Sequence, residues 1–179
     1  MKTHLARLER VAIDHQLAFE TTWLEPIGRI MTLLQRFGLR NNLVGDISPA
    51  AVVQEHLVEA LVAIEAANKT LTAPPATVVD VGAGAGLEGL LMALAWPHAT
   101  VIAVEPRRKR ADFIELAADA AGVGDRVQVI RLELRAAHFP LASLMTSRAT
   151  FSVSPRPVTH STRPPLVTRC PASCLVPAW

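Results

Sequence analysis

Three glycines at alternating positions, Gly82, Gly84 and Gly86, follow an apolar run that contains one acid, Asp80. Glycine adopts positive φ angles without a steric penalty and lets the backbone approach a ligand closely. Where such a turn opens a helix, the free N–H groups of the helix N-terminus point toward the ligand. The segment therefore predicts a binding site for a nucleotide-like molecule.

The residues around these glycines narrow the choice of ligand. No Lys-Ser or Lys-Thr pair follows these glycines, which excludes the phosphate-binding loop of nucleoside triphosphatases. Gly84, Gly86 and Gly89, with Glu105 further on, satisfy the spacing of a dinucleotide site. Asp80 would repel a pyrophosphate but suits the ammonium group of a methionine moiety, so we favour S-adenosylmethionine as the cofactor. A tight turn that binds no ligand is the remaining alternative.

The densest run of charge lies where a helix is expected to start, and it consists of Arg107, Arg108, Lys109 and Arg110. Cations in the first turn of a helix oppose the helix dipole and cost about 0.3–1 kcal/mol each. An anionic partner such as RNA phosphate explains this placement, and a solvated helix face is the alternative. Binding to RNA that weakens steeply with salt would distinguish the two.

Hydrophobic periodicity predicts alternating strands and helices over residues 74–151. The expected helices are 86–95 and 107–121, and the expected strands are 76–81, 99–104, 127–131 and a short one near 144–146. This order predicts an α/β fold with a parallel sheet and right-handed crossovers.

Residues 1–73 are expected to form an N-terminal helical extension. Apolar spacing predicts two helices before a stop at Gly38, and Ser48 with Pro49 is a good N-cap and first-turn pair for a third. His56 falls on the apolar face of this third helix without a second ligand at metal spacing. It is therefore expected to pack in the core rather than to bind a metal.

The composition suits one domain, with 179 residues, half of them apolar, and a net charge of +2. No stretch reaches the roughly 18 apolar residues of a spanning helix, and the N-terminus lacks the apolar segment of a signal peptide. We therefore expect a soluble, cytoplasmic protein. Cys170 and Cys174 are too few and too close together for a disulfide framework or a four-ligand metal site, so no metal is expected.

Several motifs in order along the chain resemble one family, the bacterial methyltransferases that modify N7 of a guanine in the 530 loop of 16S ribosomal RNA (RsmG or GidB). The resemblance spans residues 25–151. The segments that carry it are Asn42-Leu43-Val44, His56, the glycine loop through Gly89, Lys109-Arg110 with Phe113, Arg135-Ala136-Ala137 and Ser147-Arg148-Ala149. It implies a Rossmann-like class I methyltransferase sheet that uses S-adenosylmethionine, with 16S ribosomal RNA or the small ribosomal subunit as partner of a monomer.

The resemblance also implies roles for single residues. Glu105 would bind the ribose, Ala136 and Ala137 would face the adenine, and Arg148 would be the active-site arginine that holds the base or the methionine carboxylate. The expected cofactor contacts near the first strand are Asp80, Gly82, Gly84, Gly86 and Leu87. The expected RNA contacts are Arg107, Arg108, Lys109, Arg110 and Arg135.

Residues 152–179 depart from the family, whose members continue with several more strands. This segment is rich in Pro, Arg and Ser, and we expect a tail without regular structure. It is either an ordinary flexible tail or the product of a shifted reading frame. The sheet is then incomplete on its C-terminal side, and its fourth strand is an exposed edge.

Three functions remain from the sequence alone. The first is a guanine-N7 methyltransferase acting on 16S ribosomal RNA. The second is a truncated, inactive relative that retains cofactor or RNA binding. The third is an NAD-dependent oxidoreductase, which rests on Gly84, Gly86, Gly89 and Glu105 alone.

Overall fold

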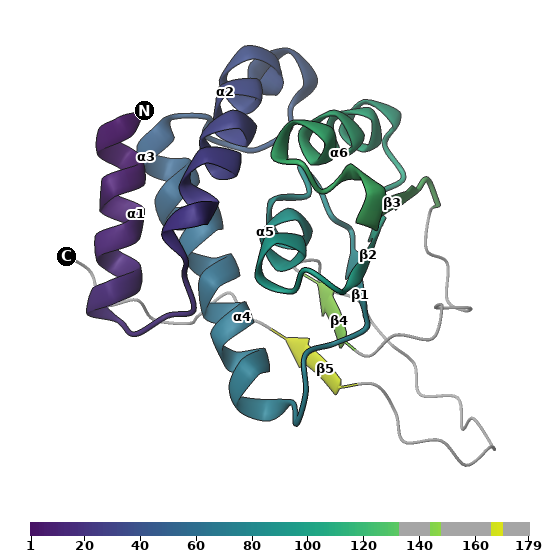
Figure 1. Ribbon diagram of the computed structural model, residues 1–179. Coiled ribbons are helices and arrows are strands. Elements are labelled where there is room, and N and C mark those ends of the chain that lie inside the picture. The colour runs from purple at the N-terminus through teal and green to yellow at the C-terminus, as the bar shows by residue number, and fades with distance from the viewer. Residues whose placement is uncertain (133–143, 148–165, 170–179) are drawn as a thin grey trace.

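The computed structural model describes residues 1–132, 144–147 and 166–169 (Figure 1). Within them, five parallel strands form one sheet in the order β3-β2-β1-β4-β5. The strands are β1 (Thr77–Val81), β2 (Thr100–Val104), β3 (Val127–Ile130), β4 (Leu144–Ser147) and β5 (Leu166–Arg169). The predicted α/β fold with a parallel sheet is confirmed.

Two helices, α5 (Leu87–Ala95) and α6 (Arg108–Ala121), connect β1 to β2 and β2 to β3. Both crossovers step across the sheet in the same direction, so right-handed connections place both helices on the same face (Figure 1). On this face Val78, Val101 and Leu144 lie side by side in register and are fully buried. The helices and this row of strand residues form the main core.

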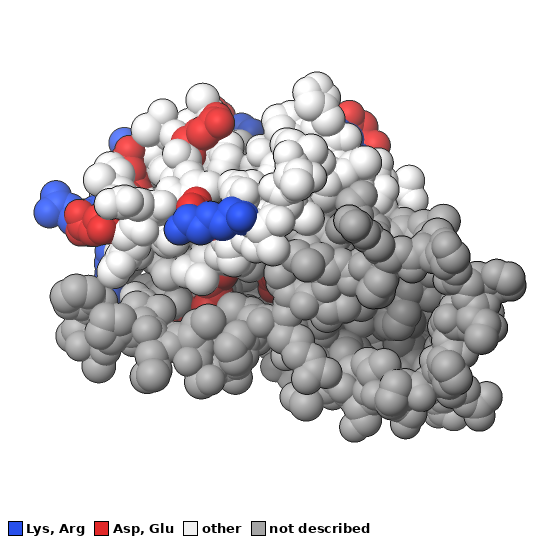
Figure 2. All heavy atoms as spheres, turned by 90° about the horizontal axis from the view of Figure 1, so that it is seen from below, with Lys and Arg blue, Asp and Glu red and all other residues white. Residues whose placement is uncertain are grey.

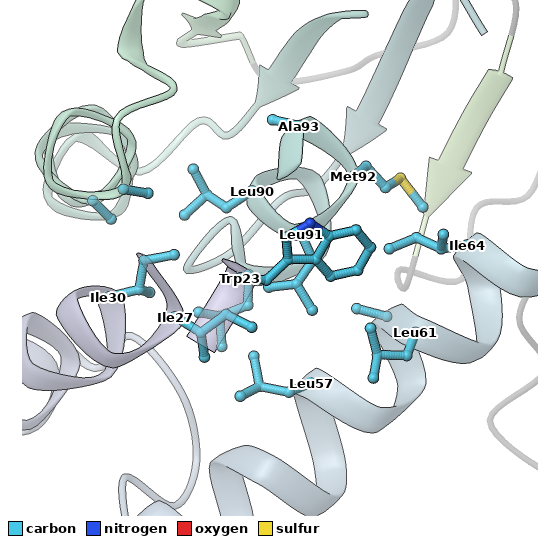
Figure 3. Packing of buried hydrophobic residues seen from close by; sticks show 14 of the residues in the cluster. Trp23, Ile27, Ile30, Leu57, Leu61, Ile64, Leu90, Leu91, Met92 and Ala93 are labelled. Atoms are coloured by element: carbon cyan, nitrogen blue, oxygen red, sulfur yellow. The ribbon is translucent and has the colours of Figure 1, made fainter. Parts of the chain in front are cut away.

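The N-terminal helices pack against the same face and belong to the same core. They are α1 (Lys2–Asp14), α2 (Leu24–Asn41), α3 (Pro49–Val52) and α4 (Val58–Thr70), and a π-helical turn over Val53–Leu57 joins α3 to α4. Figure 3 shows side chains of α2, of α4 and of the turns before them packing near those of α5. These residues belong to one buried cluster and include Trp23 of the short turn Thr21–Trp23, Ile27, Ile30, Leu57, Leu61, Ile64, Leu90, Leu91 and Met92. Because this core is continuous, the N-terminal helices fix the position of α5 and of the glycine loop before it.

The helix boundaries in this region follow identifiable contacts. The Ser48 hydroxyl accepts a hydrogen bond from the Ala51 N–H at 3.3 Å, as expected of an N-cap. The predicted stop at Gly38 is wrong, because α2 continues to Asn41 and ends where Asn42 adopts a left-handed φ of 49°. Gly38 lies against Ile47 instead, with room for no Cβ, so this glycine serves packing rather than termination.

The segment predicted to lack regular structure contains a strand, and for residues 166–169 that prediction is wrong. β5 pairs with β4 from Leu144↔Leu166 to Ser147↔Arg169. The β4 backbone presents N–H and C=O groups on both of its sides. On the side away from β1, these groups pair with Leu166–Arg169, a short segment that contains the β-branched residues Val167 and Thr168. The sequence predicted that the fourth strand would be an exposed edge. It is not, because β5 pairs with it.

The surface seen from below shows single cations and anions scattered among uncharged side chains (Figure 2). In this view the described residues gather no large patch of one charge. No helix in the described part of the chain is long and apolar enough to cross a membrane.

Candidate functional site

The strand order reverses between β1 and β4, because the chain adds β2 and β3 on one side of β1 and β4 on the other. Crevices outside the carboxyl ends of the strands at such a reversal are the usual ligand sites of open parallel sheets. Gly82 follows the last residue of β1, and Glu105 follows the last residue of β2. The structure thus brings the glycine loop and its expected acid together at one edge of the sheet.

The glycine loop has a conformation that requires its glycines. Gly82, Gly84 and Gly86 have φ angles of 69°, 61° and 71°, in the left-handed region that other residues seldom adopt. The N–H groups of Gly82 and Ala83 donate to the Val104 carbonyl at 2.8 and 3.1 Å, and the Gly86 N–H donates to the Ala83 carbonyl at 2.7 Å. These bonds hold the loop against the end of β2.

Glu105 joins the glycine loop to the start of α6. Its side chain is buried, with 3% of the residue exposed. One carboxylate oxygen, Oε2, accepts the Gly84 N–H at 2.9 Å, and the other, Oε1, accepts the Arg107 N–H at 2.9 Å. Each carboxylate oxygen has two lone pairs, so both can still accept a hydroxyl of a ribose. This geometry is compatible with the predicted role of Glu105.

Asp80 lies beneath the loop, 2% exposed, and its Oδ2 accepts the Gly89 N–H in the first turn of α5 at 3.2 Å. A carboxylate at a helix N-terminus occupies the place that a phosphate takes in a dinucleotide site. The protein itself therefore supplies the negative charge at this end of α5, which disfavours a pyrophosphate there. Leu87, 3% exposed, points into the core, so its backbone is the part that faces the loop.

The space around the loop differs between its glycines. Among the described residues, a Cβ on Gly84 would meet only the Gly82 carbonyl oxygen, at 3.9 Å. A Cβ on Gly86 would lie 2.8 Å from Ile114 Cγ1, within the core. Gly84 thus faces open space among the described residues, whereas Gly86 lets α6 approach the loop closely.

The basic run does not act as one unit. Arg107, Arg108 and Lys109 are exposed, and Arg108 Nε lies 3.6 Å from Asp112 Oδ2. Arg110 is partly buried, and its Nε and Nη2 donate to the Asn42 carbonyl at 3.1 and 2.7 Å, at the end of α2. Arg110 therefore holds two helices together, a role that the sequence did not predict.

Four predicted site residues lie outside the described residues, namely Arg135, Ala136, Ala137 and Arg148. Sequence reasoning also missed Thr146, which stands beside Asp80 in the β1–β4 register and is 1% exposed. Its hydroxyl has no hydrogen-bond partner among the described residues. A polar residue within a short buried strand is the signal that could have identified it.

The model of a protein family described as "rRNA small subunit methyltransferase G" matches residues 24–163. The chain belongs to this family. A protein of that name from Wolinella succinogenes is 28% identical over 148 residues, which cover 83% of this chain and 73% of the relative. One from Rhizorhabdus wittichii is 34% identical over 97 residues, which cover 53% of this chain and 43% of the relative. The chain thus spans between two fifths and three quarters of these two relatives.

A solved structure supports the fold independently. The chain matches a protein described as a putative O-methyltransferase from Klebsiella pneumoniae with a TM-score of 0.51, at 14% identity, over 80% of this chain and 60% of that one. At this identity the likeness concerns the fold alone. The predicted class I methyltransferase fold with N-terminal helices is confirmed.

Proposed function

We propose that the chain binds S-adenosylmethionine and transfers its methyl group to N7 of a guanine in 16S ribosomal RNA. The observation that carries this proposal is Glu105, whose carboxylate bridges the glycine loop and α6 at the carboxyl edge of the sheet. An acid at this position is suited to the hydroxyls of a ribose. The family and the names of its relatives support methyl transfer to ribosomal RNA.

The residues present fit an adenosyl cofactor. Glu105 retains lone pairs for the ribose, and the loop leaves open space above Gly84 where a Cβ would otherwise intrude. Gly82 and the Leu87 backbone flank that space along the chain. We assign the methionine end to the side of Asp80, and the adenine and the target base to Ala136, Ala137 and Arg148.

The chemistry asks mainly for positioning. The cofactor, when bound, supplies an electrophilic methyl group on a sulfonium sulfur. Guanine N7 would accept this methyl group with its own lone pair, and the cofactor would leave as a neutral thioether. N7 carries no proton that must be removed, so the protein needs no general base. Its contribution is to hold the two reactants in line, which a loop fixed by hydrogen bonds at both ends is able to do.

The exposed Arg107, Arg108 and Lys109 support an RNA partner, because they begin two residues after Glu105 and face solvent. We propose 16S ribosomal RNA or the small ribosomal subunit as this partner, and a monomer in the cytoplasm as the acting form. The dinucleotide alternative is disfavoured by the Asp80 carboxylate at the start of α5.

Calorimetric titration with S-adenosylhomocysteine tests cofactor binding, and transfer of labelled methyl groups to unmethylated small ribosomal subunits tests the reaction. We expect micromolar binding and methyl incorporation at a guanine. Gly45→Ala is a control for handling and folding, since a Cβ at this exposed loop residue meets nothing within 4 Å. Binding without methyl transfer would identify the chain as an inactive remnant, and no binding by the folded chain would contradict the proposal.

A further inference from the structure

We infer that RNA is held by a composite surface made from two helices, in which Arg36 and Arg40 of α2 act together with Arg107, Arg108 and Lys109 at the start of α6. This composite basic surface rests on the proposed function and extends it to an element remote from the basic run in sequence. Arg110 belongs beneath the surface, as the residue that positions one helix against the other.

The two helices lie antiparallel, so their basic ends meet. At one end the Arg29 guanidinium donates to the Ala120 carbonyl, which joins the start of α2 to the end of α6. At the other end Arg110 donates to the Asn42 carbonyl, which joins the start of α6 to the end of α2. Figure 1 shows the two helices as neighbours over the top of the molecule.

Helix geometry places the arginines of α2 on its solvent side, opposite the buried residues Ile27, Met31 and Leu34. At about 100° per residue, Arg36 and Arg40 lie within about 20° of the direction of Arg29. Arg29 reaches the end of α6 from this side with its long side chain, so Arg36 and Arg40 share a solvent-exposed side of α2 that adjoins α6. The rise of about 1.5 Å per residue brings Arg40 roughly level with Arg110.

These cations have few partners of their own. Within the described part of the chain, Arg36, Arg40, Arg107 and Lys109 make no ion pair, and all four are exposed. The Arg36 guanidinium lies over the Phe37 ring, 5.2 Å from its centroid. Like charges four residues apart on a helix repel each other by about 0.2–0.5 kcal/mol. The repulsion between Arg36 and Arg40 therefore lowers the stability of the free protein slightly.

A polymer with repeated charges fits this arrangement better than a single anion. Packed helices lie about 8–10 Å apart, so the cations of α2 and α6 are spaced to meet different phosphates. The α6 part of the surface starts at Arg107, whose N–H is bound by Glu105, the proposed ribose-binding acid. An RNA strand bound by the cations of both helices therefore approaches the proposed site of methyl transfer.

The test is binding of a fluorescein-labelled RNA hairpin that copies the 530 loop, measured by fluorescence anisotropy from about 0.05 to about 0.3 M salt. The variant Arg36→Gln/Arg40→Gln removes two charges and retains helix-forming side chains. Each phosphate contact adds about 0.7–0.9 to the salt slope. Loss of two contacts is expected to lower the slope by about 1.4–1.8 and the affinity at 0.1 M salt by roughly 25- to 60-fold.

Three comparisons make the result specific. Arg7→Gln/Arg10→Gln removes two exposed charges from α1 and is expected to change RNA affinity less than about twofold. Arg36→Lys/Arg40→Lys is expected to retain binding, because the charge stays. Titration with S-adenosylhomocysteine is expected to be unchanged in every variant, which shows that the fold and the cofactor site are intact.

The inference is wrong if Arg36→Gln/Arg40→Gln binds the hairpin as the unsubstituted chain does, or if the α1 variant loses as much affinity. It is also wrong if the unsubstituted chain binds S-adenosylhomocysteine but no RNA at low salt. Failure of the proposed function is seen separately, as absence of cofactor binding by the unsubstituted chain.

Discussion

Alanine at two neighbouring glycines should separate ligand binding from folding. Gly84 and Gly86 have φ angles of 61° and 71°, so alanine at either costs about 1–2 kcal/mol of backbone strain. At Gly84 the new Cβ meets nothing closer than 3.9 Å, so strain is the whole cost to stability. At Gly86 it lies 2.8 Å from Ile114 Cγ1, which adds about 1–3 kcal/mol of overpacking.

Urea denaturation followed by circular dichroism measures these free energies of unfolding. We expect Gly84→Ala to lose about 1–2 kcal/mol and Gly86→Ala about 2–5 kcal/mol. In calorimetry with S-adenosylhomocysteine, the loss of affinity should instead be larger for Gly84→Ala than for Gly86→Ala. The Cβ of Gly84→Ala enters the ligand space and should weaken binding at least tenfold, a loss of about 1.4 kcal/mol. The folded fraction of Gly86→Ala should bind more nearly as the unsubstituted chain does.

Gly84→Asn separates strain from steric exclusion. Asparagine tolerates the left-handed region better than alanine, so this variant should recover stability and still fail to bind. Equal destabilisation by alanine at Gly84 and Gly86 would refute the argument from local space. Unchanged cofactor affinity in both Gly84 variants would refute the assignment of the loop to the ligand.

Three further substitutions test the contacts around the site. Glu105→Gln replaces one accepting oxygen by an NH₂ group that faces an N–H. It should lower the free energy of unfolding, measured by urea denaturation, by about 1.5–3 kcal/mol and should also weaken cofactor binding. A variant as stable as the unsubstituted chain would contradict the bridging role. Arg110→Ala should lower stability by about 1 kcal/mol through loss of the Asn42 bonds and leave the salt slope of RNA binding unchanged. Ser48→Ala should cost about 1 kcal/mol with unchanged ligand binding, and Ser48→Asp should restore it.

The central elements could be predicted from sequence because their signals are local. Apolar β-branched runs indicate the strands, and two residues that commonly follow a helix, Pro97 and Gly122, lie just beyond α5 and α6. The predicted helix 107–121 corresponds to Arg108–Ala121, and the predicted strand 99–104 to Thr100–Val104. The glycine loop and Glu105 were predicted as parts of one site from their spacing along the chain.

Contacts between distant segments could not be predicted in the same way. Arg110 and Asn42 are 68 residues apart, and nothing near either residue indicates the other. Gly38 suggested the end of α2, but it lies within the helix because Ile47 packs closely against it, a tertiary contact that the local sequence does not reveal. The strand within residues 166–169 depended on an available partner, since its own sequence is short and flanked by residues typical of irregular structure.

The position of Arg110 changes the meaning of the basic run. Considered along one helix, a cation in the first turn is unfavourable, which suggested that all four cations await an anion. In the folded chain the carboxyl end of α2, with its partial negative charge, lies beside that turn, and Arg110 donates two hydrogen bonds to the carbonyl of the C-cap residue Asn42. One of the four cations is therefore explained by packing. Arg108 lies 3.6 Å from Asp112, which leaves Arg107 and Lys109 as the cations of the run without an ion pair among the described residues. The proposed contact with RNA phosphate accounts for these two cations and for Arg36 and Arg40 at the same end of α2.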